Sequence, residues 1–121
     1  MSAEIIDVSD RILTFRITGQ LKHSEFTAAQ RQAADLIRRQ GKVRILVLVE
    51  NFTGTEKAGD WGDVSFQVQN DPFIEKIAIV GDTAWKDLTL LFTGKGVRRV
   101  PIEYFAPADL SKARAWLIDT P

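Results

Sequence analysis

The chain has 121 residues, of which 45% are hydrophobic and 26% are charged, and its 16 basic side chains balance 16 acidic ones. This length and composition predict one globular domain over residues 1–121 with a single well-buried core. A net charge of zero provides no general attraction for nucleic acid or an anionic membrane. The absence of cysteine excludes disulfides, a thiolate nucleophile and any cysteine-based metal site.

The first ten residues, MSAEIIDVSD, have no basic segment followed by a long apolar run, so we do not expect a signal peptide. No stretch of the sequence reaches the roughly 20 apolar residues that a membrane-spanning helix needs. The simplest expectation is a cytoplasmic protein without a transmembrane segment.

The N-terminal part of the chain predicts a β-hairpin. Apolar residues alternate over residues 5–8 and 12–17, on either side of Ser9, Asp10 and Arg11. We expect Gly19 to end this hairpin.

A helix is predicted from Ser24 to Gln40. Its apolar side consists of Phe26, Ala29, Ala33, Leu36 and Ile37, which recur at the helical period. Ser24 is the expected N-cap and Gly41 the expected glycine after the last turn.

Two apolar runs predict buried strands, residues 43–49 and residues 77–80. Nearly continuous apolar runs are typical of strands that are covered on both faces, as in the centre of a parallel sheet. Residues 50–57 are expected to form a polar loop. A weaker helix should follow that loop, with Trp61, Val64, Ser65 and Val68 on one side.

The C-terminal part of the chain continues the alternation of helix and strand. Asp82 or Thr83 should cap a helix that ends near Gly94, and a basic loop, a strand over residues 102–105 and a helix over residues 109–118 should follow. The order β-β-α-β-α-β-α-β-α predicts an α/β domain with about four helices. Its sheet of four or five strands should be mixed but mainly parallel, entered through the antiparallel hairpin.

The turn at Gly81 and Asp82 has the order strand, glycine, acidic residue, helix, with which nucleotide sites often begin. The three-glycine pattern of dinucleotide sites is missing, and a carboxylate at the helix start would repel a phosphate. A structural N-cap is therefore the favoured interpretation of Asp82, and a ligand-facing role is the alternative.

Gly54 and Gly59 have the spacing of the two glycines in a phosphate-binding loop. The lysine and hydroxyl residue that should follow are replaced by Asp60 and Trp61, so we exclude a nucleoside triphosphatase.

No pattern of catalytic or metal-binding residues is recognisable. His23 is the sole histidine, and Glu50, Glu56, Asp60 and Asp63 are scattered without the spacing of a metal site. We expect no catalytic residue, metal or cofactor. An enzyme that uses His23 or Asp60 ranks last among the functional hypotheses.

Aromatic residues on the predicted helices, among them Trp61, Trp85 and Trp116, are expected mainly in the core. Alternatively, Phe66, Trp85 and Phe92, with Asp82 at the helix start, line a site for a hydrophobic ligand. The basic loop with Lys95, Arg98 and Arg99 would then dock phosphate headgroups, although such a loop is more often simply solvated.

The segment KIAIVGDTAW at 76–85, Tyr104-Phe105 and the segment ARAWL at 113–117 resemble the bacterial SpoIIAA-like family. That family is related in fold to STAS domains and to the lipid-binding lobe of Sec14/CRAL-TRIO proteins. The resemblance extends over nearly the whole chain. It implies a sheet of four or five strands with helices packed against it and no established enzymatic activity.

The resemblance also points to Thr53. In anti-sigma-factor antagonists of this fold, a serine in the turn after the central strand is phosphorylated by a partner kinase. Here the corresponding stretch runs from Glu50 to Gly54 without a serine, and Thr53 is the residue that could stand in as phospho-acceptor, at the expected helix start.

These observations predict a non-enzymatic binding or regulatory module that acts through protein–protein contacts, with a protein partner or a second copy of itself. The alternative is a carrier or sensor of a small lipid-like hydrophobic ligand. Nucleic acid is not an expected partner.

Overall fold

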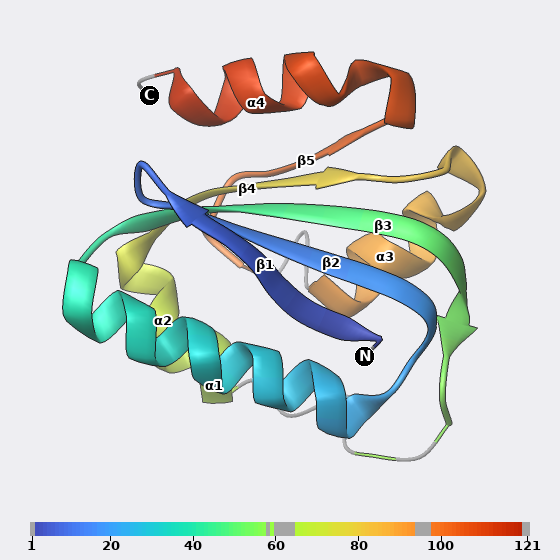
Figure 1. The fold of residues 1–121 in the computed structure, drawn as a ribbon, viewed down its shortest axis with the longest axis horizontal. Coiled ribbons are helices and arrows are strands. Elements are labelled where there is room, and N and C mark those ends of the chain that lie inside the picture. The colour runs from blue at the N-terminus through green and yellow to red at the C-terminus, as the bar shows by residue number, and fades with distance from the viewer. Residues whose placement is uncertain (1, 58, 60–64, 94–97, 120–121) are drawn as a thin grey trace.

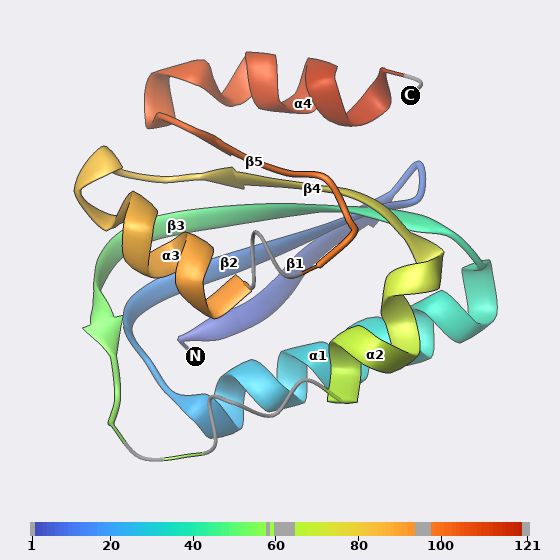
Figure 2. The same ribbon diagram turned by 180° about the vertical axis from the view of Figure 1, so that it is seen from behind.

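A five-stranded sheet lies between two layers of helices in the computed structural model, which describes residues 2–57, 59, 65–93 and 98–119 (Figure 1). The strands are β1 (Ala3–Ser9), β2 (Ile12–Leu21), β3 (Val43–Thr55), β4 (Ile74–Val80) and β5 (Ile102–Phe105). The helices are α1 (His23–Gln40), α2 (Ser65–Asn70), α3 (Lys86–Thr93) and α4 (Leu110–Ile118). Helices α1, α2 and α3 cover one face of the sheet and α4 covers the other, as the view from behind also shows (Figure 2).

The strands are neighbours in the order β1-β2-β3-β4-β5. β1 is antiparallel to β2, and every later pair is parallel, which confirms the predicted mixed, mainly parallel sheet. Asp10 and Arg11 form the hairpin turn with φ of 51° and 64°. Two left-handed residues in succession give a two-residue turn whose twist matches that of the strands.

The hairpin pairing of β2 with β1 ends at Ile17, before Gly19 as predicted. β2 itself continues to Leu21, and its register with β3 shifts on both sides of Gly19. Gly19 has φ of +63°, so it lets the strand change direction without ending it.

Helix α1 ends at Gln40 as predicted but begins one residue earlier, at His23. Its buried stripe consists of Ala29, Ala33 and Ile37, and the Gly41 amide donates to the Ile37 carbonyl over 2.8 Å. The predicted N-cap, Ser24, lies inside the helix. Glu56 supplies the acceptor instead, because its Oε1 accepts a hydrogen bond of 2.6 Å from the His23 amide.

Both central strands are longer than predicted. β3 reaches Thr55 because its pairing with β2 continues, so the loop predicted for residues 50–57 is largely strand. β4 begins at Ile74 instead of residue 77.

The apolar runs in β3 and β4 are explained by burial on both faces. Toward α1, the core includes Leu13, Ile45, Val47, Ile77 and Ile79. Toward α4, a second cluster consists of Leu46, Ala78, Val80, Ala113 and Leu117. No helix in the described part of the chain is long and apolar enough to cross a membrane.

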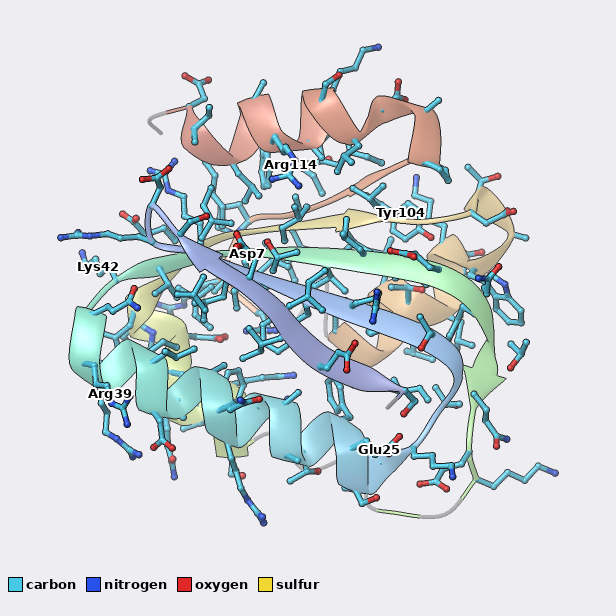
Figure 3. All side chains as sticks on the ribbon, in the orientation of Figure 1. Asp7, Glu25, Arg39, Lys42, Tyr104 and Arg114 are labelled. Carbon is cyan, nitrogen blue, oxygen red and sulfur yellow. The ribbon has the colours of Figure 1, made fainter. Side chains whose placement is uncertain are left out.

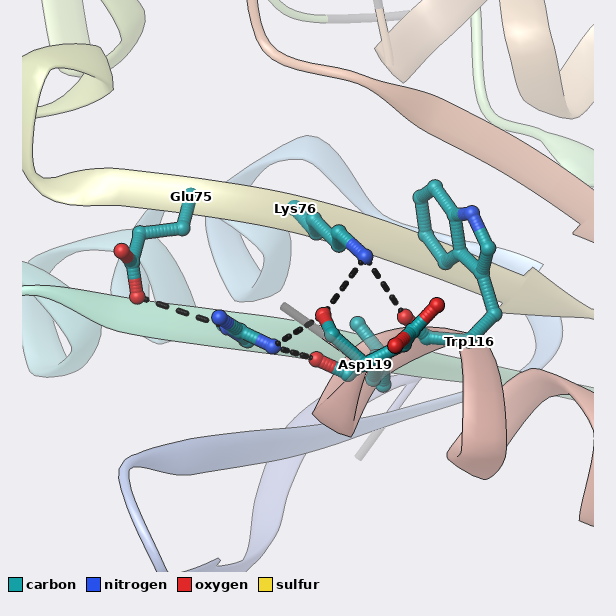
Figure 4. Close-up of polar contacts among 6 residues, drawn as sticks. Glu75, Lys76, Trp116 and Asp119 are labelled. Carbon is teal, nitrogen blue, oxygen red and sulfur yellow. Dashed lines mark hydrogen bonds and ion pairs between the residues drawn. The ribbon is translucent and has the colours of Figure 1, made fainter. Parts of the chain in front are cut away.

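Two cations from the sheet hold the carboxyl end of α4 (Figure 4). Lys76 on β4 is 7% exposed, and its Nζ donates to the carbonyls of Trp116 at 2.8 Å and Asp119 at 2.9 Å. Arg44 on β3 donates to the carbonyls of Leu117 and Asp119. Because the last carbonyls of a helix lack intrahelical partners and carry partial negative charge, these cations fix α4 against the sheet.

Candidate functional site

Strand β3 extends beyond β4 at the carboxyl edge of the sheet. Its ladder with β4 ends at Leu48 and Val80, whereas its ladder with β2 continues to Thr55. In open α/β sheets, ligands bind where the carboxyl ends of the strands leave the sheet. We therefore define a carboxyl-edge surface from Asn51, Thr53, Asp82, Trp85 and Tyr104.

Asn51 and Thr53 are the extra residues where the register of β3 with β2 shifts. Each lies between two residues that pair with β2, and both are exposed. Asn51 has φ of 49°, a left-handed conformation that asparagine tolerates better than most residues. Thr53 thus lies within a strand, and its predicted position at a helix start is wrong.

The turn after β4 has the structural role predicted for Asp82. The Asp82 Oδ1 accepts a hydrogen bond of 2.8 Å from the Ala84 amide at the start of a 3₁₀ turn, Thr83–Trp85, that leads into α3. The Trp85 ring lies edge-on to Phe52 of β3, with centroids 5.0 Å apart and an interplanar angle of 73°. Half-buried, Trp85 joins the end of β3 to the start of α3.

Tyr104 of β5 completes this surface. Its hydroxyl donates to the Asp82 carbonyl over 2.8 Å. Burial raises the pKa of the Tyr104 hydroxyl above its usual value, and the negative charge of Asp82 adds to the rise. The phenol therefore remains protonated, as a donor to Asp82, at neutral pH.

Gly81 is required by the close approach of Tyr104. A Cβ at position 81 would lie 2.7 Å from the Tyr104 hydroxyl and 3.0 Å from the Val49 Cβ. We expect Gly81→Ala to lower the free energy of unfolding by about 1–3 kcal/mol, as other overpacked sites do. Urea denaturation measures this. In the Gly81→Ala, Tyr104→Phe double variant the loss should be smaller than the sum of the two single losses, because the overlapping oxygen is gone; strict additivity would contradict the contact.

The segment after β3 is fastened to the start of α1. Glu56 accepts from the His23 amide, and Gly59, with φ of +98°, lies so close that a Cβ there would be 2.5 Å from the His23 Cβ. This contact involves the backbone amide of His23 and does not test the catalytic alternative predicted for its side chain. His23 and Glu56 connect two segments of the fold.

We expect Gly59→Ala to break this connection. The added methyl group combines left-handed strain, roughly 1–2 kcal/mol, with the overlap onto His23. Amide hydrogen exchange at His23 should become faster. Gly41→Ala is the matched control, because Gly41 has φ of +85° but nothing within 4 Å of its added Cβ. Equal exchange at His23 in both variants would contradict the role given to the contact.

An apolar cavity of about 60 Å³ lies between the sheet and helices α1 and α2. It is lined by Ala3, Phe15, Ile17, Phe26, Gln30, Ile45, Val47, Phe66, Gln67, Ile77, Thr93 and Arg98. Of the predicted ligand-binding residues, Phe66 lines this cavity. Trp85 and Asp82 lie instead at the carboxyl-edge surface, and the Phe92 side chain is outside the described part of the structure.

Arg98 does not belong to a solvated basic loop. Its side chain is 8% exposed and forms a two-pronged ion pair with Asp71, in which Nε donates to Oδ2 over 2.9 Å. Its Nη1 donates to the Thr93 carbonyl over 3.0 Å. Arg99 is exposed, and Lys95 lies outside the described residues.

The remaining candidates give no catalytic constellation. Glu50 is exposed within β3, whereas Asp60, Trp61 and Asp63 lie outside the described residues. Within the described ranges, no three histidine or carboxylate side chains gather as metal ligands do.

Comparison with known proteins identifies relatives of this fold. A family model described as SpoIIAA-like matches residues 12–118. Among solved structures, the chain is similar to an uncharacterized protein of the DUF3478 family with a SpoIIAA-like fold from Shewanella loihica PV-4. The two share 16% sequence identity with a TM-score of 0.70, over 95% of this chain and 91% of that one. No curated protein gives a significant match.

Proposed function

Because the chain belongs to the SpoIIAA-like family, we propose that it is a non-enzymatic binding or regulatory module that acts through protein–protein contacts at the carboxyl-edge surface. The observation that carries this proposal is the display of Asn51 and Thr53. Both are exposed extra residues of a strand whose far side has no strand neighbour in the described part of the chain beyond Leu48. Residues held outside a regular ladder are often placed for recognition.

The composition of the surface supports the same proposal. Trp85 and Tyr104 are half-buried, so each offers part of an aromatic ring beside exposed polar groups. Tyrosine and tryptophan are enriched in protein interfaces, where they combine apolar area with a hydrogen-bonding group. Asp82 anchors both residues through its carbonyl, to which the Trp85 amide and the Tyr104 hydroxyl donate.

Thr53 is the proposed point of regulation. Its side chain is exposed, so a kinase can reach the hydroxyl without unfolding the sheet. A phosphate would add about two negative charges to the carboxyl-edge surface and would change its electrostatics. Thr53→Glu should therefore alter partner binding while leaving the fold intact.

The experiment that tests this function compares partners captured by matched variants. Thr53→Arg places a long cation on the carboxyl-edge surface. The control, Arg39→Glu with Lys42→Glu, changes charge at the opposite end of the molecule, where Figure 3 shows both side chains far from Tyr104. We expect quantitative affinity capture to recover a protein with the wild type and the control but not with Thr53→Arg. Identical capture by all three proteins would refute the proposal.

A second function is supported by the cavity beside Phe66. We propose as the alternative that the protein carries or senses a small hydrophobic, lipid-like ligand held under α1 and α2. The apolar lining of the cavity favours this function, since small-molecule sites are mostly apolar with a few polar groups.

A further inference from the structure

The cavity beside Phe66 lies between the strands of the sheet on one side and helices α1 and α2 on the other. The side formed by the sheet includes Ile17 on β2, Val47 on β3 and Ile77 on β4. On the opposite side, helix α1 contributes Phe26 and helix α2 contributes Phe66. Helix α2 is only six residues long. A helix of that length covers little of the sheet beside α1, and the described side chains leave space between them.

The size of the cavity limits what it can hold. A buried water needs at least about 10–15 Å³ of such volume, so the 60 Å³ available here admits at most about four to six water-sized groups. An acyl chain of a membrane lipid does not fit. A ligand that fits inside the cavity has no more than about six non-hydrogen atoms.

The lining determines the charge of the ligand. Most of the wall is apolar, and the polar side chains are Gln30, Gln67, Thr93 and Arg98. The charge of Arg98 is already balanced by Asp71, with which it forms a partly buried ion pair. Among the described lining residues no other side chain is charged, so a charged ligand would be desolvated without a free counter-charge from them, which is costly. The wall therefore favours a neutral molecule with one polar group.

We propose that this cavity is a binding site for a small, neutral, mostly apolar molecule of at most about six non-hydrogen atoms with one polar group. The polar group lies toward Gln67 and Arg98, and the apolar part lies between Phe15, Phe26 and Phe66. The inference rests on the second function proposed above and replaces a lipid with a much smaller ligand.

Methyl NMR of the whole protein tests the ligand class with three probes. 2-Butanone is neutral and has five non-hydrogen atoms, butyrate has a comparable chain with a charge, and 1-decanol is lipid-like. We expect 2-butanone to shift the methyl signals of Ile17, Val47 and Ile77 in a saturable way, and butyrate to shift them at least tenfold more weakly. Unchanged methyl signals with both 2-butanone and 1-decanol would overturn the proposal and the second function together. Tighter binding of 1-decanol would overturn the small-ligand proposal but uphold a lipid-like ligand.

Filling the cavity provides the matched control. Ala3→Val adds two methyl groups to the lining, and Ala84→Val adds the same groups at an exposed position. We expect Ala3→Val to weaken 2-butanone binding at least tenfold and Ala84→Val to leave it unchanged. Val47→Ile provides the same measurement with one added methyl group if Ala3→Val does not fold. Equal binding by the filled variants and the wild type would place the probe elsewhere and refute the assignment.

Discussion

Asp71→Asn is expected to lower the free energy of unfolding by about 3 kcal/mol, at the lower end of the range for broken buried ion pairs. The substitution keeps the size and one acceptor oxygen of the side chain but removes its charge. Arg98, which is 8% exposed, would then carry an uncompensated charge next to an apolar cavity. Chemical denaturation followed by tryptophan fluorescence measures the change.

The control for this prediction removes both charges. In the double variant Asp71→Leu, Arg98→Met, no buried charge remains unpaired, so its stability should be closer to that of the wild type than that of Asp71→Asn is. If Asp71→Asn lowers the free energy of unfolding by less than about 0.5 kcal/mol, the ion pair behaves as an exposed one. That result would contradict the prediction.

Lys76→Met is expected to destabilise the protein by about 2–3 kcal/mol, because hydrogen bonds to charged groups are worth more than neutral ones. Methionine keeps an apolar stem of similar length beside Trp116, whose ring centroid lies 4.8 Å from the Lys76 Nζ. The carbonyls of Trp116 and Asp119 lose their charged donor. Hydrogen exchange should therefore accelerate first in the last turn of α4.

A lysine on α4 itself offers the control. Lys112 is 76% exposed and pairs with Asp109 at the surface, so Lys112→Met should change stability by less than about 0.5 kcal/mol. Equal effects of the two substitutions would contradict the view that Lys76 holds α4 through its carboxyl end.

The order of the elements could be predicted because buried segments have a recognisable local pattern of apolar residues. Residues 43–49 are nearly all apolar because β3 is covered by α1 on one face and by α4 on the other. The stripe of Ala29, Ala33 and Ile37 marks α1 in the same way. The capping role of Asp82 was also accessible, since the cap and the amide that it accepts from are two residues apart.

Features that depend on distant residues could not be predicted. Glu56 replaces Ser24 at the start of α1 across 33 residues, and Asp71 pairs with Arg98 across 27. No spacing rule connects such partners, and a run of two arginines gives no sign that one of them is buried. The extension of β3 to Thr55 could not be predicted from the sequence either, because it depends on pairing with β2, which is distant along the chain.

The separation of Phe66 from Trp85 has a similar cause. Both are aromatic residues on elements that follow a central strand. The apolar pattern therefore predicts the same environment for both. The structure assigns Phe66 to the cavity under α2 and Trp85 to the end of β3. Which part of the sheet a helix covers depends on the length of that helix and of its connections, and neither is encoded in the apolar pattern.

The spatial order of the strands, which is the same as their order along the chain, has a consequence for synthesis on the ribosome. Each strand that emerges finds its only earlier neighbour already in place, so the sheet can grow by one edge without waiting for a distant segment. The local hairpin of β1 and β2 provides the first edge. Helix α4 emerges last and meets Arg44 and Lys76 on strands that are already paired. We expect its docking to be the final step of folding, the one that removes the second apolar face of the sheet from contact with other nascent chains.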